Sequence, residues 1–145
     1  MNTITLEIIG YVIIFAIISV CVAPAQTPLE IVTATIILEA GGEYSEGAMH
    51  AINEVITNRS NKRRISKADV CLQPYQFSCW NNVGLASQLA KAKRHPRWKE
   101  AKSIADGMAT NYTRGADHYH ADYCDPYWNK HMEITTRIGR HIFYK

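Results

Sequence analysis

A strong helix-start signal stands near residue 27 and introduces a long apolar run. Residues 27–30 (Thr-Pro-Leu-Glu) have the form of a capping box with proline at the first helical position. The residues that follow are mostly apolar through Ala40, and the glycines at 41–42 then interrupt the pattern. The pattern therefore predicts an apolar first helix that ends at Ala40.

Three further helices are predicted downstream. Ser45 is the expected N-cap of the second, and apolar residues then recur at intervals of three and four at Ala48, Ala51, Ile52, Val55 and Ile56. This helix is expected to run out near residues 58–59, before the basic stretch 61–64. A third helix is predicted over 85–93, closed by His95-Pro96. A fourth is expected to begin near Pro96, with one apolar side formed by Trp98, Ala101, Ile104, Ala105 and Met108.

The pattern changes after Gly107. Residues 111–128 are rich in aromatic, histidine and turn residues, whereas residues 134–144 alternate loosely between apolar and polar. The alternation predicts a short hairpin bent at Gly139. The sequence therefore predicts an α+β fold that is mainly helical, with a small β element near the C-terminus.

Composition and charge restrict the class of protein. The chain has 145 residues, 47% hydrophobic and 20% charged, which fits one folded domain and excludes wholesale disorder. The formal net charge of +3 suits an anionic polymer as partner but is too small to indicate nucleic acid. We expect a monomer.

The N-terminus has the character of an export signal. Residues 8–25 form an uncharged, mostly apolar run that ends in Ala23-Pro24-Ala25, the small-residue pattern expected before a signal-peptidase cut. The residues before this run carry no positive charge, so a retained membrane anchor stays open as an alternative. We expect residues 1–25 to be a signal peptide or signal anchor and residues 26–145 to be the working domain. Whether the segment is cleaved or kept as a membrane anchor, we expect the working domain to lie in the periplasm, the cell wall or the extracellular space.

The cysteines leave two alternatives open. Cys71 and Cys79 are eight residues apart, so they could close a short disulfide loop in an oxidising compartment, with Cys124 left over. The alternative is three buried free thiols. No C-x₂-C pair is present, and we expect no cysteine-bound zinc.

Glu39 is the most unusual carboxylate in the sequence. It follows Ile36, Ile37 and Leu38 on the apolar first helix and stands just before the glycine break. A carboxyl group at such a position loses part of its hydration, which favours the protonated form and suits a general acid. The alternative is a glutamate at a helix end that faces solvent. Glu43, four residues on, is a candidate partner carboxylate, or it interacts favourably with the N-terminus of the next helix.

Two polar–aromatic segments are candidates for substrate binding. In residues 73–81 (QPYQFSCWN) we expect Gln76, Phe77 and Ser78 to contact a sugar, unless the aromatic rings of this run pack inward. In the second segment His118, Tyr119 and His120 are expected to form a cleft wall that hydrogen-bonds the ligand. On a strand His118 and His120 would share one face, as a zinc pair could. The helical H-E-x-x-H pattern of zinc hydrolases is absent, so we expect no metal and no other cofactor.

Taken together, these segments resemble the SleB-type cell wall hydrolases, which include spore cortex-lytic enzymes and related phage and bacterial peptidoglycan hydrolases. The resemblance covers roughly residues 31–145. The matching segments, in order, are residues 37–43 (ILEAGGE), 46–59 (EG-x₄-AINEVITNR), 73–78 (QPYQFS), 115–121 (GADHYHA) and 138–144 (IGRHIFY). The chain departs from the family at Gly41, where a larger residue is more usual.

The resemblance implies a lysozyme-like catalytic domain in which Glu39 is the catalytic acid. It also implies a lytic transglycosylase or muramidase that cleaves the MurNAc–GlcNAc linkage of peptidoglycan glycan strands. In a transglycosylase Glu39 would protonate the glycosidic oxygen, then accept a proton from the C6 hydroxyl and leave a 1,6-anhydro sugar.

Two other functions stay open at this point. One is a zinc amidase or peptidase that acts on the peptide stems through His118 and His120. The other is a non-catalytic wall-binding protein that keeps the same fold. In each case we expect basic side chains to bind anionic wall polymer, namely Lys62, Arg63, Arg64, Lys91, Lys93, Arg94 and Arg97.

Overall fold

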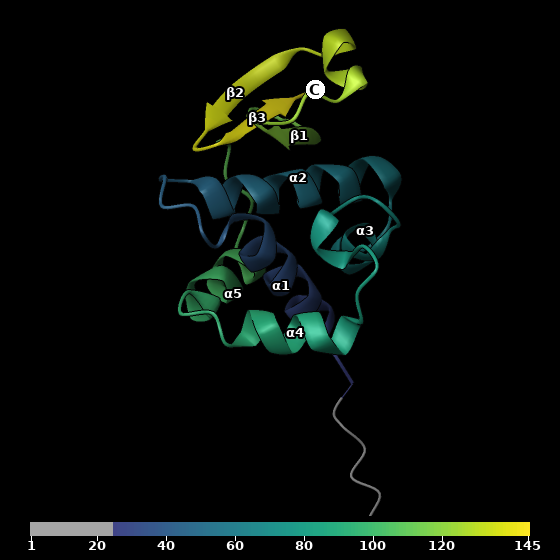
Figure 1. Cartoon of the computed structure of the whole chain (residues 1–145), viewed down its shortest axis with the longest axis vertical. Helices are drawn as coiled ribbons and strands as arrows, with labels where there is room; N and C mark the ends of the chain where they lie inside the picture. The colour runs from purple at the N-terminus through teal and green to yellow at the C-terminus, as the bar shows by residue number, and fades with distance from the viewer. Residues whose placement is uncertain (1–24) are drawn as a thin grey trace, which may run out of the picture.

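The computed structural model describes residues 25–145, in which five α-helices precede and support a small sheet (Figure 1). The α-helices are α1 (Pro28–Ala40), α2 (Ala48–Arg63), α3 (Lys67–Leu72), α4 (Leu85–Lys93) and α5 (Trp98–Asp106). Two short 3-10 helices are η1 (Ser78–Trp80) and η2 (Tyr127–His131). The strands are β1 (His118–Ala121), β2 (Ile134–Ile138) and β3 (His141–Tyr144). The predicted mainly helical α+β class is confirmed.

Helix α1 is the centre of the helical part. The predicted capping box is present, because the Thr27 hydroxyl accepts from the Glu30 amide and the Glu30 carboxylate accepts from the Thr27 amide. Every side chain from Ile31 to Ile37 is buried. A helix buried on all sides needs apolar residues all round, which explains the unbroken apolar run in the sequence. In Figure 1 α1 crosses between α2 and α4, with α5 against it.

Helix α2 starts and ends differently from the prediction. Its N-cap is Gly47, with a left-handed φ of 82°, and the expectation that Ser45 caps this helix is wrong. The Ser45 hydroxyl instead lies against the turn at Gly139, where an added Cβ would come within 2.5 Å of it. Gly47 itself packs against the Tyr112 ring, which leaves no room for a side chain. The helix continues through the basic stretch to Arg63.

The remaining helices divide into predicted and unpredicted ones. The predicted bounds of α4 are confirmed, and α5 buries Ala101, Ile104 and Ala105 as expected. Met108, expected on the same apolar face, lies beyond the end of α5 and is 93% exposed, so that expectation is wrong. Helix α3 was not predicted, because six residues are too few to show a helical period.

The three strands form an antiparallel sheet with the order β1-β3-β2. The predicted hairpin is confirmed as β2 and β3, joined at Gly139 with φ 56°. Strand β1 adds to the free edge of β3, so Tyr119 lies opposite Phe143.

Helix α2 joins the sheet to the other helices. Its Ala51 and Val55 pack with Ala116 and Phe143 on the sheet side, whereas Ile52 and Ile56 belong to the helical core. Figure 1 shows the sheet above α2 and the other helices below it. The cleft around Glu39 forms where these two parts meet.

Two sequence expectations concern cysteines and membranes. The disulfide between Cys71 and Cys79 is not formed; these residues and Cys124 are free thiols. Cys71 is buried, Cys79 half-buried and Cys124 exposed. Within residues 25–145 no helix combines the length and apolar character needed to cross a bilayer. The predicted signal segment lies almost entirely outside the described residues.

Candidate active site

A cleft of about 360 Å³ opens where the end of α1 meets the sheet. Five parts of the chain line it: the last turn of α1, α2 through Arg59, the loop after α3 with η1, strand β1 with its following turn, and the start of β3. The lining side chains are Leu38, Glu39, Arg59, Gln76, Ser78, Tyr119, His120, Ala121, Tyr123, Cys124 and His141. Five of the eight sequence-predicted site residues are therefore brought together: Glu39, Gln76, Ser78, Tyr119 and His120.

Glu39 is half-buried in this cleft and is held by three hydrogen-bond donors. Its Oε1 accepts from the Cys79 amide at 3.0 Å and from the Ser78 hydroxyl at 3.3 Å. Its Oε2 accepts from the Tyr119 hydroxyl at 2.8 Å. The carboxylate is thus fixed in orientation by groups from η1 and β1, and the alternative of a helix-end glutamate facing bulk solvent does not hold.

Tyr119 keeps its proton beside this carboxylate. Burial, followed by the negative charge of Glu39, raises the pKa of the Tyr119 hydroxyl well above its ordinary value of 10.0. A phenol can donate to an ionised carboxylate and can also accept from a protonated one. Tyr119 can therefore hydrogen-bond Glu39 in both of its protonation states.

His141 is a cleft residue that the sequence reasoning did not select as part of the site. It starts β3, is 9% exposed, and meets the Tyr119 ring edge-on with centroids 5.3 Å apart. Its Nδ1 is buried and has no hydrogen-bond partner in the described part of the chain. Burial lowers the pKa of His141 from 6.5, although the charges of Glu43 and Glu39 oppose this shift.

Glu43 lies outside the cleft lining. Its carboxylate packs on the hairpin turn, where a Cβ at Gly139 would come within 2.4 Å of Oε2. Its negative charge acts on His141 and opposes the lowering of the pKa of that ring. Gly41, between the two glutamates, is buried, and a Cβ there would stand 3.2 Å from the His95 ring.

The loop after α3 contributes both to the cleft and to the core. Gln76 and the exposed Ser78 line the cleft, whereas Phe77 is 2% exposed and packs beneath it. The guanidinium of Arg59 lies over the Phe77 ring at 5.1 Å, and the Tyr119 ring lies 6.4 Å away. Phe77 therefore supports the cleft floor and does not line it.

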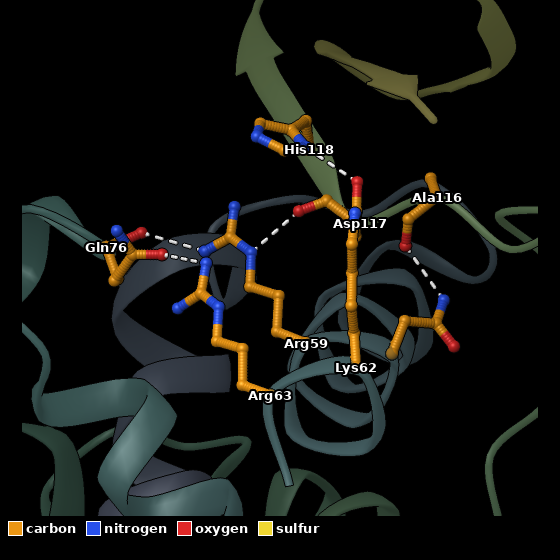
Figure 2. A network of polar contacts seen from close by, with 8 residues as sticks. Arg59, Lys62, Arg63, Gln76, Ala116, Asp117 and His118 are labelled. Carbon is orange, nitrogen blue, oxygen red and sulfur yellow. Dashed lines mark hydrogen bonds and ion pairs between the residues drawn. The ribbon is translucent and has the colours of Figure 1, made fainter. Parts of the chain in front are cut away.

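Arg59 and its neighbours on α2 tie the two walls of the cleft together (Figure 2). Arg59 donates to the backbone oxygens of Asp117, at 2.6 Å, and Gln76, at 3.1 Å. Arg63 donates to the Gln76 side chain at 2.7 Å, and Lys62 pairs with the Asp117 carboxylate at 2.7 Å. Figure 2 shows these side chains rising side by side from α2 toward the loop and β1. Arg59 ends the matching segment 46–59, but no role in the site was predicted for it, because its burial depends on contacts distant along the chain.

His118 and His120 share one face of β1, as expected for a strand, and Tyr119 points the other way, toward Glu39. Both histidine rings contact Trp128, at 5.3 and 5.7 Å between centroids. His118 Nδ1 is bonded to Asp117, and the two nitrogens of His120 are bonded to the Ala121 oxygen and the Tyr144 hydroxyl. Three His, Cys, Asp or Glu side chains grouped to hold a metal ion are not found in residues 25–145. Of the two histidines, His120 lines the cleft and His118 does not.

Comparison with protein families gave a match to most of the described domain. A family model described as Cell Wall Hydrolase matches residues 42–144, a segment that holds η1, the sheet and every cleft residue except Leu38 and Glu39. Comparison with curated proteins and with solved structures gave no match.

Proposed function

Because this chain belongs to the cell wall hydrolase family, we propose that it cleaves peptidoglycan glycan strands with Glu39 as general acid and base. Family membership by itself indicates peptidoglycan hydrolysis and an exported or wall-associated protein. The observation that carries the finer proposal is that Glu39 is the only carboxylate lining the cleft in residues 25–145. Cleavage of a sugar–sugar bond needs an acid of this kind beside the leaving oxygen.

In the proposed reaction Glu39 works twice. The protonated carboxyl gives its proton to the oxygen that joins MurNAc to GlcNAc, and the bond from MurNAc C1 to that oxygen breaks. The carboxylate then accepts the proton of the MurNAc C6 hydroxyl, whose oxygen bonds to C1. The product is a 1,6-anhydro sugar, no water is consumed, and Glu39 regains its proton.

The cleft lining favours this transglycosylase route over hydrolysis. Hydrolysis by the usual route needs a second carboxylate about 5–9 Å from the acid, as nucleophile or to activate water. Glu43 is the nearest candidate in sequence, but its carboxylate is packed on the hairpin turn. A mechanism that uses one carboxylate as both acid and base fits the single glutamate of the cleft.

Four other side chains complete the proposed site. Tyr119 and Ser78 hold the Glu39 carboxyl in position for proton transfer. Gln76 and His120 line the cleft and offer polar groups to the sugar hydroxyl and acetamido groups. We further propose that residues 1–25 export the domain and are either cleaved or kept as an anchor, and that the domain acts as a monomer on peptidoglycan without a cofactor.

The decisive experiment digests purified sacculi with the wild-type domain and with Glu39→Gln, and analyses the products by mass spectrometry. We expect anhydro-muropeptides from the wild type and a loss of about 10²–10⁴-fold in rate for Glu39→Gln, the usual range for a general acid. Glu46→Gln changes an exposed glutamate outside the cleft and should cleave at the wild-type rate.

Other outcomes would overturn specific parts of the proposal. Products with reducing ends would replace the transglycosylase route by hydrolysis. Free stem peptides whose release stops on chelation would favour the zinc amidase instead. A Glu39→Gln protein that is folded and fully active would remove Glu39 from the mechanism.

A further inference from the structure

A second hollow, of about 270 Å³, lies beside the cleft, and we propose that it binds an N-acetylhexosamine unit of the same glycan strand. The inference rests on the proposed function and extends its site. Helix η1 connects the two, because Ser78 lines the cleft and Trp80 lines the hollow. The other lining residues are Leu72, Pro74, Tyr75, Asn81 and Asn82.

The Tyr75 side chain faces solvent, and its backbone has a conformation that is unfavourable for a tyrosine. Its side chain is 85% exposed, and its φ of 61° is in the left-handed region, which bulky residues rarely adopt. Asn82, at the end of the lining segment, also has a left-handed φ, of 56°, which asparagine adopts more readily than tyrosine. Strained backbone conformations cluster at sites that bind ligands. An exposed aromatic ring stabilises the fold little, so the fold alone does not explain the strain at Tyr75.

The rest of the hollow has the chemistry of a sugar site. The Trp80 indole N–H donates to the Thr35 hydroxyl at 2.9 Å, which fixes the half-buried ring in one orientation. The side-chain amides of Asn81 and Asn82 make no hydrogen bond to other groups within residues 25–145. A sugar ring offers an apolar C–H face to aromatic rings, and its acetamido group offers one donor and one acceptor to amides.

The charge of the lining side chains indicates which component of the cell wall the hollow would bind. All six lining side chains are neutral, so the hollow offers no positive charge to a phosphate or a stem-peptide carboxylate. The basic side chains Arg59 and Arg63 lie on the cleft side and are bonded to the loop. A neutral N-acetylated sugar is therefore the ligand that fits, and we expect the hollow to add affinity for long glycans.

The test measures binding without cleavage. The probe is the hexamer of N-acetylglucosamine, titrated into the Glu39→Gln domain by calorimetry, so the result does not depend on the proposed reaction. Tyr75→Gly removes the ring and suits the left-handed backbone, so the melting temperature should not fall. We expect at least fivefold weaker binding for Tyr75→Gly. The matched control, Tyr127→Ala, removes an 83% exposed tyrosine outside the hollow and should bind like its parent.

Each outcome is decisive. Equal affinities for the Tyr75→Gly and Tyr127→Ala proteins, or no binding of the hexamer to their parent, would overturn the subsite. If Tyr75→Gly weakens the binding of a soluble stem peptide and leaves the binding of the hexamer unchanged, the assignment of a sugar as the ligand is overturned. If the subsite is confirmed but the active wild type releases no glycan fragments, the proposed function fails and the binding site stands.

Discussion

At the residue scale, the cleft combines a half-buried carboxyl group, a half-buried phenol and a buried imidazole. Glu39 and Tyr119 satisfy each other by a hydrogen bond, whereas His141 is buried with one ring nitrogen unpaired. Burial lowers the pKa of His141 below 6.5, which means that the folded protein holds this ring neutral. The unfolded chain has no such restriction and binds a proton near the ordinary histidine value of about 6.5.

This difference predicts a pH dependence of stability. As the pH falls below about 6.5, the unfolded state takes up a proton that folded His141 resists, so the free energy of unfolding falls until the lower folded pKa is reached. We expect urea unfolding of the wild type to lose stability between about pH 7.5 and pH 5.5 more steeply than His141→Gln. Parallel pH profiles for the two proteins would contradict this account.

At the scale of elements, α2 organises both the cleft and the loop before the sheet. Toward the cleft, Arg59 binds the loop after α3 and the start of β1. Deeper in the helix, Glu54 is 2% exposed and binds the 110–113 loop. The Glu54 carboxylate accepts from the backbone amides of Tyr112 and Thr113, at 2.7 Å each, and from the Thr113 hydroxyl at 2.6 Å. It thereby fixes the segment that leads into β1.

Glu54→Gln is predicted to destabilise the domain. The amide keeps one acceptor oxygen and turns its NH₂ toward a backbone N–H, which leaves buried donors unsatisfied. We expect a loss of about 1–3 kcal/mol in the free energy of unfolding, measured by chemical denaturation. The exposed Glu46→Gln should stay within about 0.5 kcal/mol of wild type. Equal stabilities for both variants would show that the Glu54 hydrogen bonds do not matter.

The elements differ in how far the sequence predicts them. Helices α1 and α4 and the β2–β3 hairpin follow from local signals: a capping box, a helical period, and a glycine that the turn needs. The local sequence predicts Ser45 as the N-cap of α2, but Gly47 is the cap. The Ser45 hydroxyl lies against the hairpin turn at Gly139, and Gly47 packs on the Tyr112 ring. Contacts distant in the sequence decide which residue caps α2, so the residues next to the cap cannot predict it.

The candidate site shows the same division. Glu39 was found because a carboxylate on an apolar helix is unusual, and Tyr119 because it stands in a polar–aromatic run. His141 and Arg59 were not selected, since a histidine or arginine in sequence gives no sign of burial. Their positions depend on the pairing of β3 with β1 and on the packing of α2 against the loop after α3.

At the scale of the whole molecule, the positive charge is partly used within the fold. Lys62 pairs with Asp117, Lys93 with Glu30 and Arg97 with Glu100. Arg63 makes no ion pair but donates to the neutral Gln73 and Gln76 side chains. The exposed Arg64, Lys91 and Arg94 make neither an ion pair nor a side-chain hydrogen bond within residues 25–145. These three side chains are the ones we expect to attract an anionic polymer.

Wall binding should therefore depend on salt. We expect the Glu39→Gln domain to bind purified sacculi less tightly as salt rises from about 0.05 M to about 0.5 M, because exposed charges are screened. Replacing Arg64, Lys91 and Arg94 by glutamine should flatten this dependence in a sedimentation assay. A salt-independent affinity would contradict an electrostatic contribution.

The free thiols have a practical consequence for following the protein at work. Burial raises the pKa of Cys71 to about 12 and raises that of Cys79 further, so neither forms the nucleophilic thiolate near neutral pH. Cys124 is exposed and borders the Glu39 cleft. Among the cysteines of residues 25–145, a maleimide dye will therefore label Cys124 selectively, and its fluorescence will report polysaccharide entry without an engineered attachment point.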